Sequence, residues 1–184
     1  MSKRIAYLTA AALSALAVTA TVVAPVRAEE KTVMVGGAAM FPSKNIVQNA
    51  VNSKDHTTLV AAVKAAGLVP TLEGKGPFTV FAPTNAAFGK LPAGTVDNLV
   101  KPENKATLTK ILTYHVVPGK LEASDLKDGQ KLKTVEGEEL TVKKSGSSVM
   151  IVDAKGGSST VTIPNVNQSN GVIHVVDTVL MPAT

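Results

Sequence analysis

The chain has 184 residues, of which 45% are hydrophobic, 18% are charged and none is Cys; this fits one globular domain and excludes disulfide scaffolds, thiolate metal sites and cysteine nucleophiles. The formal charge is +5, but Lys3, Arg4 and Arg27 supply three of the positive charges, and from residue 29 onward 16 Lys stand against 14 acidic residues with no Arg. A nucleic-acid partner is therefore not expected, because the later Lys are scattered and the guanidinium group that binds phosphate and guanine is missing.

Residues 1–28 have the three parts of a secretory signal peptide. Residues 1–4 carry positive charge, residues 5–23 are small and apolar, and residues 26–28 form a small-x-Ala cleavage site. An uncleaved membrane anchor is the alternative, since about 20 apolar residues can span a bilayer, but the Ala and Thr content and Pro25 favour cleavage. We therefore predict a secreted or periplasmic protein whose mature form does not span the membrane.

The first part of the mature chain is predicted to be helical. Residues 29–41 show little periodicity and contain two consecutive Gly, which indicates a flexible N-terminal segment or an edge strand before a domain that covers residues 42–184. Apolar residues at helical spacing predict one helix after Ser43, its expected N-cap, and a second helix after Asp55 that ends at Gly67.

A short apolar strand and two further helices are expected next. Residues 78–82 read as a buried strand because they are β-branched or aromatic and are bounded by Pro on both sides. Thr84 is the expected cap of a brief helix, and Pro102 fits the first turn of another. Residues 114–117 are predicted to form a β-type run that follows this last helix.

The second half of the chain changes to β-type runs separated by Gly-containing turns. Strands that recur every 8–12 residues or so indicate antiparallel pairing. Because helices dominate the first half and strands the second, the fold class is predicted to be α+β rather than alternating βαβ. The expected strands cover residues 131–135, 140–144, 148–152, 160–163 and 172–181.

Catalytic and metal-binding signatures are missing from the sequence. It contains no nucleophile elbow, phosphate-binding loop, dinucleotide fingerprint or H-E-x-x-H motif. His56 is interpreted as a solvent-facing residue at a helix start, and His115 and His174 as neutral, hydrogen-bonded core side chains. The alternative is that His115 and His174, with Asp125 or Asp177 nearby, bind a metal or activate a hydroxyl. We predict no catalytic residue, no metal ligand and no cofactor.

Three other polar residues are interpreted as structural. Thr84 and Asn85 stand where a helix cap is expected. Asp177 lies in an otherwise apolar run, and a carboxylate in such a place needs partners. We expect backbone or hydroxyl groups to donate hydrogen bonds to it.

Three segments together resemble the recurrent motifs of the fasciclin domain family. They are residues 78–88 (FTVFAPTNAAF), residues 112–119 (LTYHVVPG) and residues 170–177 (NGVIHVVD), which continues to a Leu-Met-Pro sequence at residues 180–182. Their order and separation also fit, and the resemblance extends over residues 42–182. It implies a wedge-shaped β-sandwich with helices packed along it, in a protein without enzyme activity.

The resemblance also implies a binding role. Family members are generally cell-surface or matrix proteins that bind other proteins, which implies a protein or cell-envelope partner here. Carried over to this chain, the partner-binding residues are Tyr114, His115, Leu112, Val116 and Val117, and the structural motif residues are Thr84, Asn85, His174 and Asp177. One departure is Asn165-Val166, where relatives often have Asp-Ile or Asp-Val.

These observations lead to one main hypothesis and two alternatives. The main hypothesis is an exported, non-catalytic interaction module that acts in cell adhesion or in association with the envelope or matrix, with an exposed apolar patch near Tyr114. The first alternative is a periplasmic carrier with a closed pocket between sheet and helices, lined by Phe78, Phe81 and Val residues. The second is a hydrolase that uses His115 or His174 beside a Ser or Thr.

Overall fold

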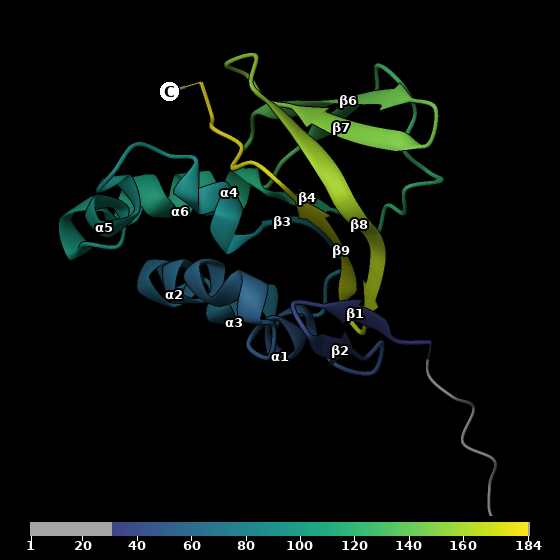
Figure 1. Ribbon diagram of the computed structural model, residues 1–184. Coiled ribbons are helices and arrows are strands. Elements are labelled where there is room, and N and C mark those ends of the chain that lie inside the picture. The colour runs from purple at the N-terminus through teal and green to yellow at the C-terminus, as the bar shows by residue number, and fades with distance from the viewer. Residues whose placement is uncertain (1–30, 184) are drawn as a thin grey trace, which may run out of the picture.

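The computed structural model describes residues 31–183, which fold into a strongly curved sheet with helices on one side (Figure 1). The signal peptide predicted for residues 1–28 lies outside these residues. Both helices and strands are present, as expected for the α+β class. The strands of the large sheet are β3 (Phe78–Pro83), β4 (Val116–Pro118), β5 (Lys131–Lys133), β6 (Glu139–Ser145), β7 (Ser148–Val152), β8 (Ser158–Gln168) and β9 (Gly171–Val176).

The large sheet is almost closed on itself. Its strand order is β4-β3-β9-β8-β7-β6-β5, and every pair is antiparallel except β3 with β9, which is parallel. The Val135 backbone N–H, just after β5, donates to the Val116 carbonyl of β4 over 2.8 Å. The two edge strands therefore meet, which protects edges that would otherwise be free to pair with another chain.

The helices pack on one side of this sheet (Figure 1). Helices α1, α2 and α3 lie together below β3 and β9 in that view, and α4, α5 and α6 lie beside them. They are α1 (Ile46–Ala50), the 3₁₀ turn η1 (Lys54–His56), α2 (Thr57–Ala66), α3 (Val69–Leu72), α4 (Asn85–Gly89), α5 (Thr95–Leu99), the 3₁₀ turn η2 (Pro102–Asn104) and α6 (Lys105–Tyr114).

Of three helix ends, one agrees with the sequence signals and two differ. Helix α2 ends at Gly67, which has a left-handed φ of 73°. Helix α1 is capped by Asn45 rather than Ser43, because Asn45 and Gln48 form a reciprocal capping box. Tyr114 is the last residue of α6 and His115 its C-cap, so the β-type run predicted for residues 114–117 begins only at Val116.

Of the two expectations for residues 29–41, a flexible segment or an edge strand, the structure shows strands in residues 33–40. Residues 33–35 (β1, Val33–Val35) and 38–40 (β2, Ala38–Met40) form an antiparallel hairpin. Val35 and Met40 are each only 3% exposed, so the hairpin contributes to the apolar core. Burial of Val35 and Met40 keeps the hairpin ordered, whereas the two consecutive Gly supply only its turn.

The motif Asn170-Gly171 joins the helices to the sheet. The Asn170 side chain accepts a hydrogen bond from the Ile46 N–H over 3.1 Å and donates to the Leu72 carbonyl over 2.7 Å, so one residue holds α1 and α3. At Gly171 an added Cβ would lie 1.9 Å from the Phe78 carbonyl oxygen. The parallel pairing of β3 with β9 at this point therefore requires glycine.

The buried apolar residues divide into two clusters, because alternate residues of β3 and β9 face opposite sides of the sheet. Val80 and Ile173 belong to the helix-side cluster, whereas Phe81 and Val176 belong to the sheet-interior cluster. The helix-side cluster lies between the helices and the sheet. The sheet-interior cluster comprises Phe81, Tyr114, Val117, Leu126, Leu132, Leu140, Val142, Val149, Ile151, Val176 and Leu180.

Candidate functional site

The Tyr114 side chain, proposed from the sequence as a partner contact, is fully buried in the sheet-interior cluster. Its hydroxyl donates to the Glu139 carbonyl over 3.3 Å and accepts from the Ala154 N–H over 2.9 Å. These bonds join the end of α6 to β6 and to the turn between β7 and β8. The arrangement satisfies the polar tip of a large side chain inside the core.

His115 is also buried, and both of its ring nitrogens have backbone partners. Nδ1 lies 2.8 Å from the Ile111 carbonyl oxygen, and Nε2 accepts a hydrogen bond from the Leu180 N–H over 2.9 Å. The ring is therefore the Nδ1–H tautomer. Burial lowers the pKa of His115 to about 4, against the opposing effects of the Ile111 carbonyl and the Asp153 charge. The neutral ring fastens the C-terminal segment to α6.

Asp153, which the sequence analysis did not single out, works beside His115. One of its carboxylate oxygens accepts from the Gly157 N–H over 2.7 Å and the other from the Met181 N–H over 3.0 Å. Leu180 and Met181 are thus each held by one of these two side chains. No sequence pattern signals this role, because Asp153 and Met181 meet only in the folded chain.

The flanking residues Leu112, Val116 and Val117 are no more than 6% exposed. The exposed apolar patch expected near Tyr114 is therefore not made by this segment. Val135, bonded to the Val116 carbonyl, is 43% exposed. The part that Tyr114, His115 and these three flanking residues play in partner binding stays a prediction. Their side chains are buried and support the fold rather than face solvent.

Thr84 and Asn85 act at the ends of two different helices. The Thr84 hydroxyl accepts from the Ala87 N–H over 3.2 Å and caps α4. Asn85 serves α2 instead of its own helix, since its carbonyl oxygen accepts from the Thr58 N–H over 3.0 Å and its amide donates to the Lys54 carbonyl over 2.9 Å. One Thr-Asn pair therefore fixes α4 against the start of α2.

His174 lies inside the sheet and stacks on Phe81 with ring centroids 5.7 Å apart. Nε2 lies 2.7 Å from the Leu121 carbonyl oxygen, and Nδ1 accepts from the Asn165 N–H over 3.3 Å. Burial lowers its pKa, although the Leu121 hydrogen bond acts in the opposite direction. His115 and His174 each bind backbone groups, so the two rings do not share a metal or a hydroxyl nucleophile among the described residues.

Asp177 is half exposed and accepts hydrogen bonds from its neighbours. Its Oδ1 accepts from the Thr160 N–H over 2.8 Å and the Thr178 hydroxyl over 3.1 Å, while Oδ2 lies 3.8 Å from the Lys90 ammonium. Partial burial acts to raise the pKa of Asp177, but these hydrogen bonds and Lys90 outweigh it and lower the value.

Asn165, noted above as a departure from the family resemblance, occupies a break in the register of β8. It is the one described residue other than Gly with a positive φ, 57°. Its side-chain oxygen Oδ1 accepts a hydrogen bond from the Ala123 N–H over 2.7 Å. Asn tolerates a positive φ better than most residues, so Asn165 suits this break in the strand. Its side chain adds a structural hydrogen bond to the Ala123 backbone.

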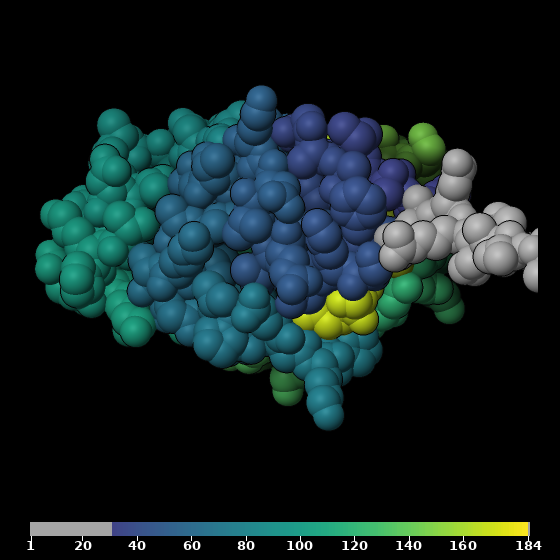
Figure 2. Space-filling view, turned by 90° about the horizontal axis from the view of Figure 1, so that it is seen from below, coloured from purple at the N-terminus to yellow at the C-terminus, as the bar shows by residue number. Residues whose placement is uncertain are grey.

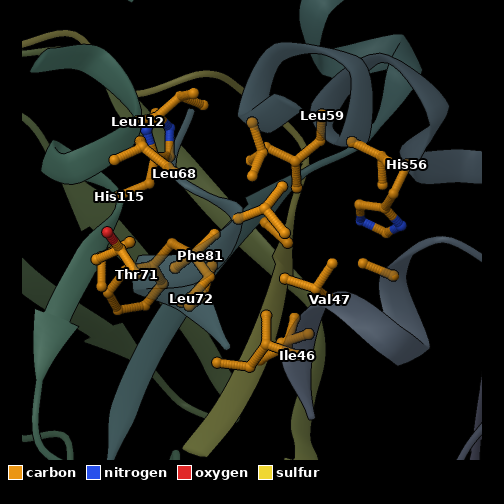
Figure 3. Close-up of a pocket in the computed structure, with 18 of the residues that line it drawn as sticks. Ile46, Val47, His56, Leu59, Leu68, Thr71, Leu72, Phe81, Leu112 and His115 are labelled. Atoms are coloured by element: carbon orange, nitrogen blue, oxygen red, sulfur yellow. The ribbon is translucent and has the colours of Figure 1, made fainter. Parts of the chain in front are cut away.

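A cavity of about 60 Å³ lies between the helices and the sheet, where the carrier hypothesis placed a pocket (Figure 3). It runs beneath α2 and is lined by side chains from the hairpin, α1, α2, α3, α6, β3 and β9. Phe81 and nine valines contribute to its wall, as that hypothesis required, but Phe78 does not. Figure 3 shows His56 and His115 on opposite sides of it.

The prediction that His56 faces solvent is wrong, because the side chain is 3% exposed and lines this cavity. Nδ1 lies 2.9 Å from the Ser53 hydroxyl. Burial lowers the pKa of His56, although the Ala82 backbone and the Asp55 charge raise it. Although the Ala82 backbone is near, Nε2 has no partner at hydrogen-bonding geometry among the described residues. The sequence signal that could have found it is its position four residues before Val60 and seven before Val63, which continues the inner stripe of α2 into the preceding turn.

Ser53 and His56 form the Ser–His pair that the hydrolase hypothesis sought at other histidines. Ser53 is 2% exposed, and no carboxylate binds the second ring nitrogen of His56 among the described residues. In the same range no group of three or more His, Asp or Glu side chains is arranged to hold a metal. A buried serine without an orienting acid lacks the access and geometry of an activated nucleophile.

Comparison with known proteins identifies the family. The model of the fasciclin domain matches residues 54–182. The chain belongs to the fasciclin domain family. It is 46% identical over 179 residues to "Protein sll1483" of Synechocystis sp., covering 97% of this chain and 96% of that protein. It is 39% identical over 152 residues to the "Cell surface glycolipoprotein MPB83" of Mycobacterium bovis, covering 80% of this chain and 64% of that protein.

A solved structure shows the same fold. This is the fasciclin domain pair of the insect cell adhesion molecule fasciclin I, with a TM-score of 0.68 and 19% sequence identity. The match covers 77% of this chain and 52% of that chain, so this chain spans about half of the pair. Within residues 31–183, no helix is both long and apolar enough to cross a membrane.

Proposed function

We propose that this fasciclin domain protein is exported and acts as a non-catalytic interaction module, binding a protein of the cell envelope or extracellular matrix. Two lines of evidence support this function. The family includes a protein named as a cell surface glycolipoprotein, which matches 80% of this chain. The histidines His115 and His174 are engaged with backbone groups, which leaves them to a structural role.

The observation that carries the proposal is the distribution of exposed apolar side chains. Of the five large ones exposed among the described residues, three belong to the hairpin and α1 region: Met34 at 60%, Val51 at 48% and Phe41 at 37%. The hairpin and α1 lie side by side on one face of the molecule (Figure 2), and the Phe41 N–H donates to the Asn49 side chain of α1 over 3.0 Å. Exposed apolar side chains that come from neighbouring elements favour a protein-binding surface.

The Tyr114–His115 segment is assigned a supporting role in this proposal. Its side chains connect α6 with the β7–β8 turn and the C-terminal segment rather than contact a partner. Substitutions there are expected to reduce binding by destabilising the domain. Substitutions at Met34 and Val51 are expected to reduce binding in a folded domain.

The test is a crosslinking pull-down from the envelope and culture medium of the source organism with wild type and the double variant Met34→Ser/Val51→Ser. Val100→Ser is the matched control, because Val100 is 36% exposed and follows α5, away from the hairpin. Circular dichroism and thermal melting establish that each variant is folded. A partner lost only by the double variant supports the proposal. Equal capture by all three proteins would place the binding surface elsewhere, and no captured protein would contradict the function itself.

A further inference from the structure

The cavity of the helix-side cluster follows the length of α2. Leu59, Val60 and Val63 line it from one stripe of this helix, while His56 precedes the helix and Leu68 follows it. A ten-residue helix is about 15 Å long. The lining therefore forms an elongated space, with one end near His56 and the other near Leu68 and His115 (Figure 3).

The wall of the cavity is almost entirely apolar. Nineteen of its 24 residues have apolar side chains, and Lys64, which is exposed, is its one charged residue. Half-buried Val47, Val60, Leu68 and Val69 belong to the same wall, so the cavity reaches toward the surface between α1, α2 and α3. Such a lining suits an uncharged hydrocarbon and disfavours an ion.

Two polar rings line this wall and differ in their hydrogen bonds. His115 uses both nitrogens in bonds to Ile111 and Leu180, which leaves neither for a ligand. His56 is 97% buried, and its Nε2 lacks a hydrogen-bond partner within residues 31–183. A buried nitrogen of this kind is stabilised when a ligand or a water supplies a partner.

We propose that the cavity beneath α2 binds an elongated, uncharged apolar molecule with a terminal hydroxyl group that hydrogen-bonds to Nε2 of His56. A hydroxyl both donates and accepts, so it pairs with either tautomer of the ring. The site goes beyond the protein-binding function. The hairpin and α1 contribute to both, but Met34 and Val51 do not line the cavity.

The short helices around the cavity allow it to admit a chain larger than its present volume of about 60 Å³. Helix α1 has five residues and α3 has four, and helices this short are held by packing rather than by their own stability. The proposal requires a modest outward shift of α1 and α3, which would widen the space between α2 and the sheet. The hydrocarbon then replaces the side-chain contacts that the shift removes.

The first experiment measures displacement of the neutral fluorescent probe N-phenyl-1-naphthylamine from the purified protein by alkan-1-ols of six to twelve carbons. Affinity is expected to increase about fourfold for each additional methylene that becomes buried. Dodecan-1-ol is expected to bind about five- to tenfold more tightly than dodecane, because only the alcohol pairs with His56. No displacement, or tighter binding of dodecanoate than of dodecan-1-ol, would overturn the proposal.

Variants place the ligand and distinguish its two ends. Val63→Phe fills the cavity and is expected to abolish displacement, whereas Ala61→Phe puts the same ring on the exposed side of α2 and should bind like wild type. His56→Phe should retain the hydrocarbon affinity and lose the preference for alcohol over alkane. Retention of this preference would contradict the role of Nε2.

Two further variants keep the test decisive. If Val63→Phe does not fold, Val63→Leu, which adds a single methylene, should weaken dodecan-1-ol severalfold. Unchanged alcohol binding by whichever variant folds would exclude this cavity as the site. Met34→Ser/Val51→Ser should bind dodecan-1-ol like wild type. Failure of the protein-binding proposal would therefore show only in the pull-down, and failure of the cavity proposal only in the probe displacement.

Discussion

The two apolar clusters of the domain are packed to different degrees. The sheet-interior cluster contains large side chains with no exposed surface, among them Phe81, Tyr114, Leu140 and Ile151. The helix-side cluster is bounded by many small residues and contains the cavity of about 60 Å³. Protein interiors normally reach the density of organic crystals, so the cavity marks the helix-side cluster as incompletely packed.

The difference follows from which elements supply the side chains. Residues inside the nearly closed sheet come from strands on opposite sides, whose alternate side chains interdigitate. The helix-side cluster is built from short helices placed on a curved surface, with Ala62, Ala66, Ala82 and Ala87 among its members. Small residues let helices approach the sheet but leave space where the two surfaces curve apart.

The largest expected effect comes from the same truncation made in each cluster. Leu140→Ala in the sheet interior is expected to lower the free energy of unfolding by about 4–5 kcal/mol, whereas Leu59→Ala beside the cavity should cost about 2–3 kcal/mol. The second side chain loses fewer contacts because the cavity already adjoins it. Urea unfolding monitored by circular dichroism measures both values. Equal losses would show that the cavity does not loosen the packing.

Protonation of His115 is expected to weaken the attachment of the C-terminal segment to α6, beside the sheet-interior cluster. Its pKa is about 4 in the folded protein and about 6.5 in the unfolded chain, so the unfolded chain binds more protons between these values. The stability contributed by the neutral ring is complete above about pH 6.5 and is lost as the pH falls to 4, a loss of about 3 kcal/mol.

Urea unfolding between pH 7 and pH 4 measures this dependence. His115→Gln is the control, because its amide does not titrate in this range; the variant should be less stable at pH 7 but show a flatter pH profile. A slope remains in the variant, since burial also lowers the pKa values of His56 and His174. A profile as steep as that of wild type would contradict the assignment to His115.

The smallest effect is expected from adding one methylene to each cluster. Val142→Leu in the sheet interior should lower the free energy of unfolding by about 1–3 kcal/mol, because Val142 is fully buried and the extra methylene must displace its neighbours. Val63→Leu places the same group in the cavity, and its stability should stay within about 1 kcal/mol of wild type. Thermal melting of the pair gives the comparison, and a destabilised Val63→Leu would mean that the cavity is narrower there than its lining implies.

Several elements of this domain were predictable because their signals are local. The strand at residues 78–82, the end of α2 at Gly67 and the β-rich second half all follow from side-chain periodicity and from residues that favour particular turns. The family was also recognisable from three short motifs, and the match over residues 54–182 confirms it. The parallel pairing of β3 with β9 was not predictable, because its partners are separated by more than 90 residues.

The site residues show the same division. Thr84 caps the helix that follows it, as its local sequence indicates, whereas Asn85 binds residues at the start of α2. His115 and His174 were interpreted correctly as hydrogen-bonded core residues, since apolar neighbours on both sides predict burial. His56 was misplaced because polar neighbours on both sides predict exposure, while the packing of η1 against α2 and α4 buries it.

The sequence by itself determined the α+β class, the family and the order of most elements, because these depend on periodicity, turn residues and motifs within short stretches of chain. Tertiary structure alone decided that Tyr114 and His115 lie inside the core, that Met34 and Val51 lie at the surface, and that a cavity with His56 in its wall remains beneath α2. Exposure and cavities depend on how distant surfaces fit together, and no local pattern of residues encodes that fit.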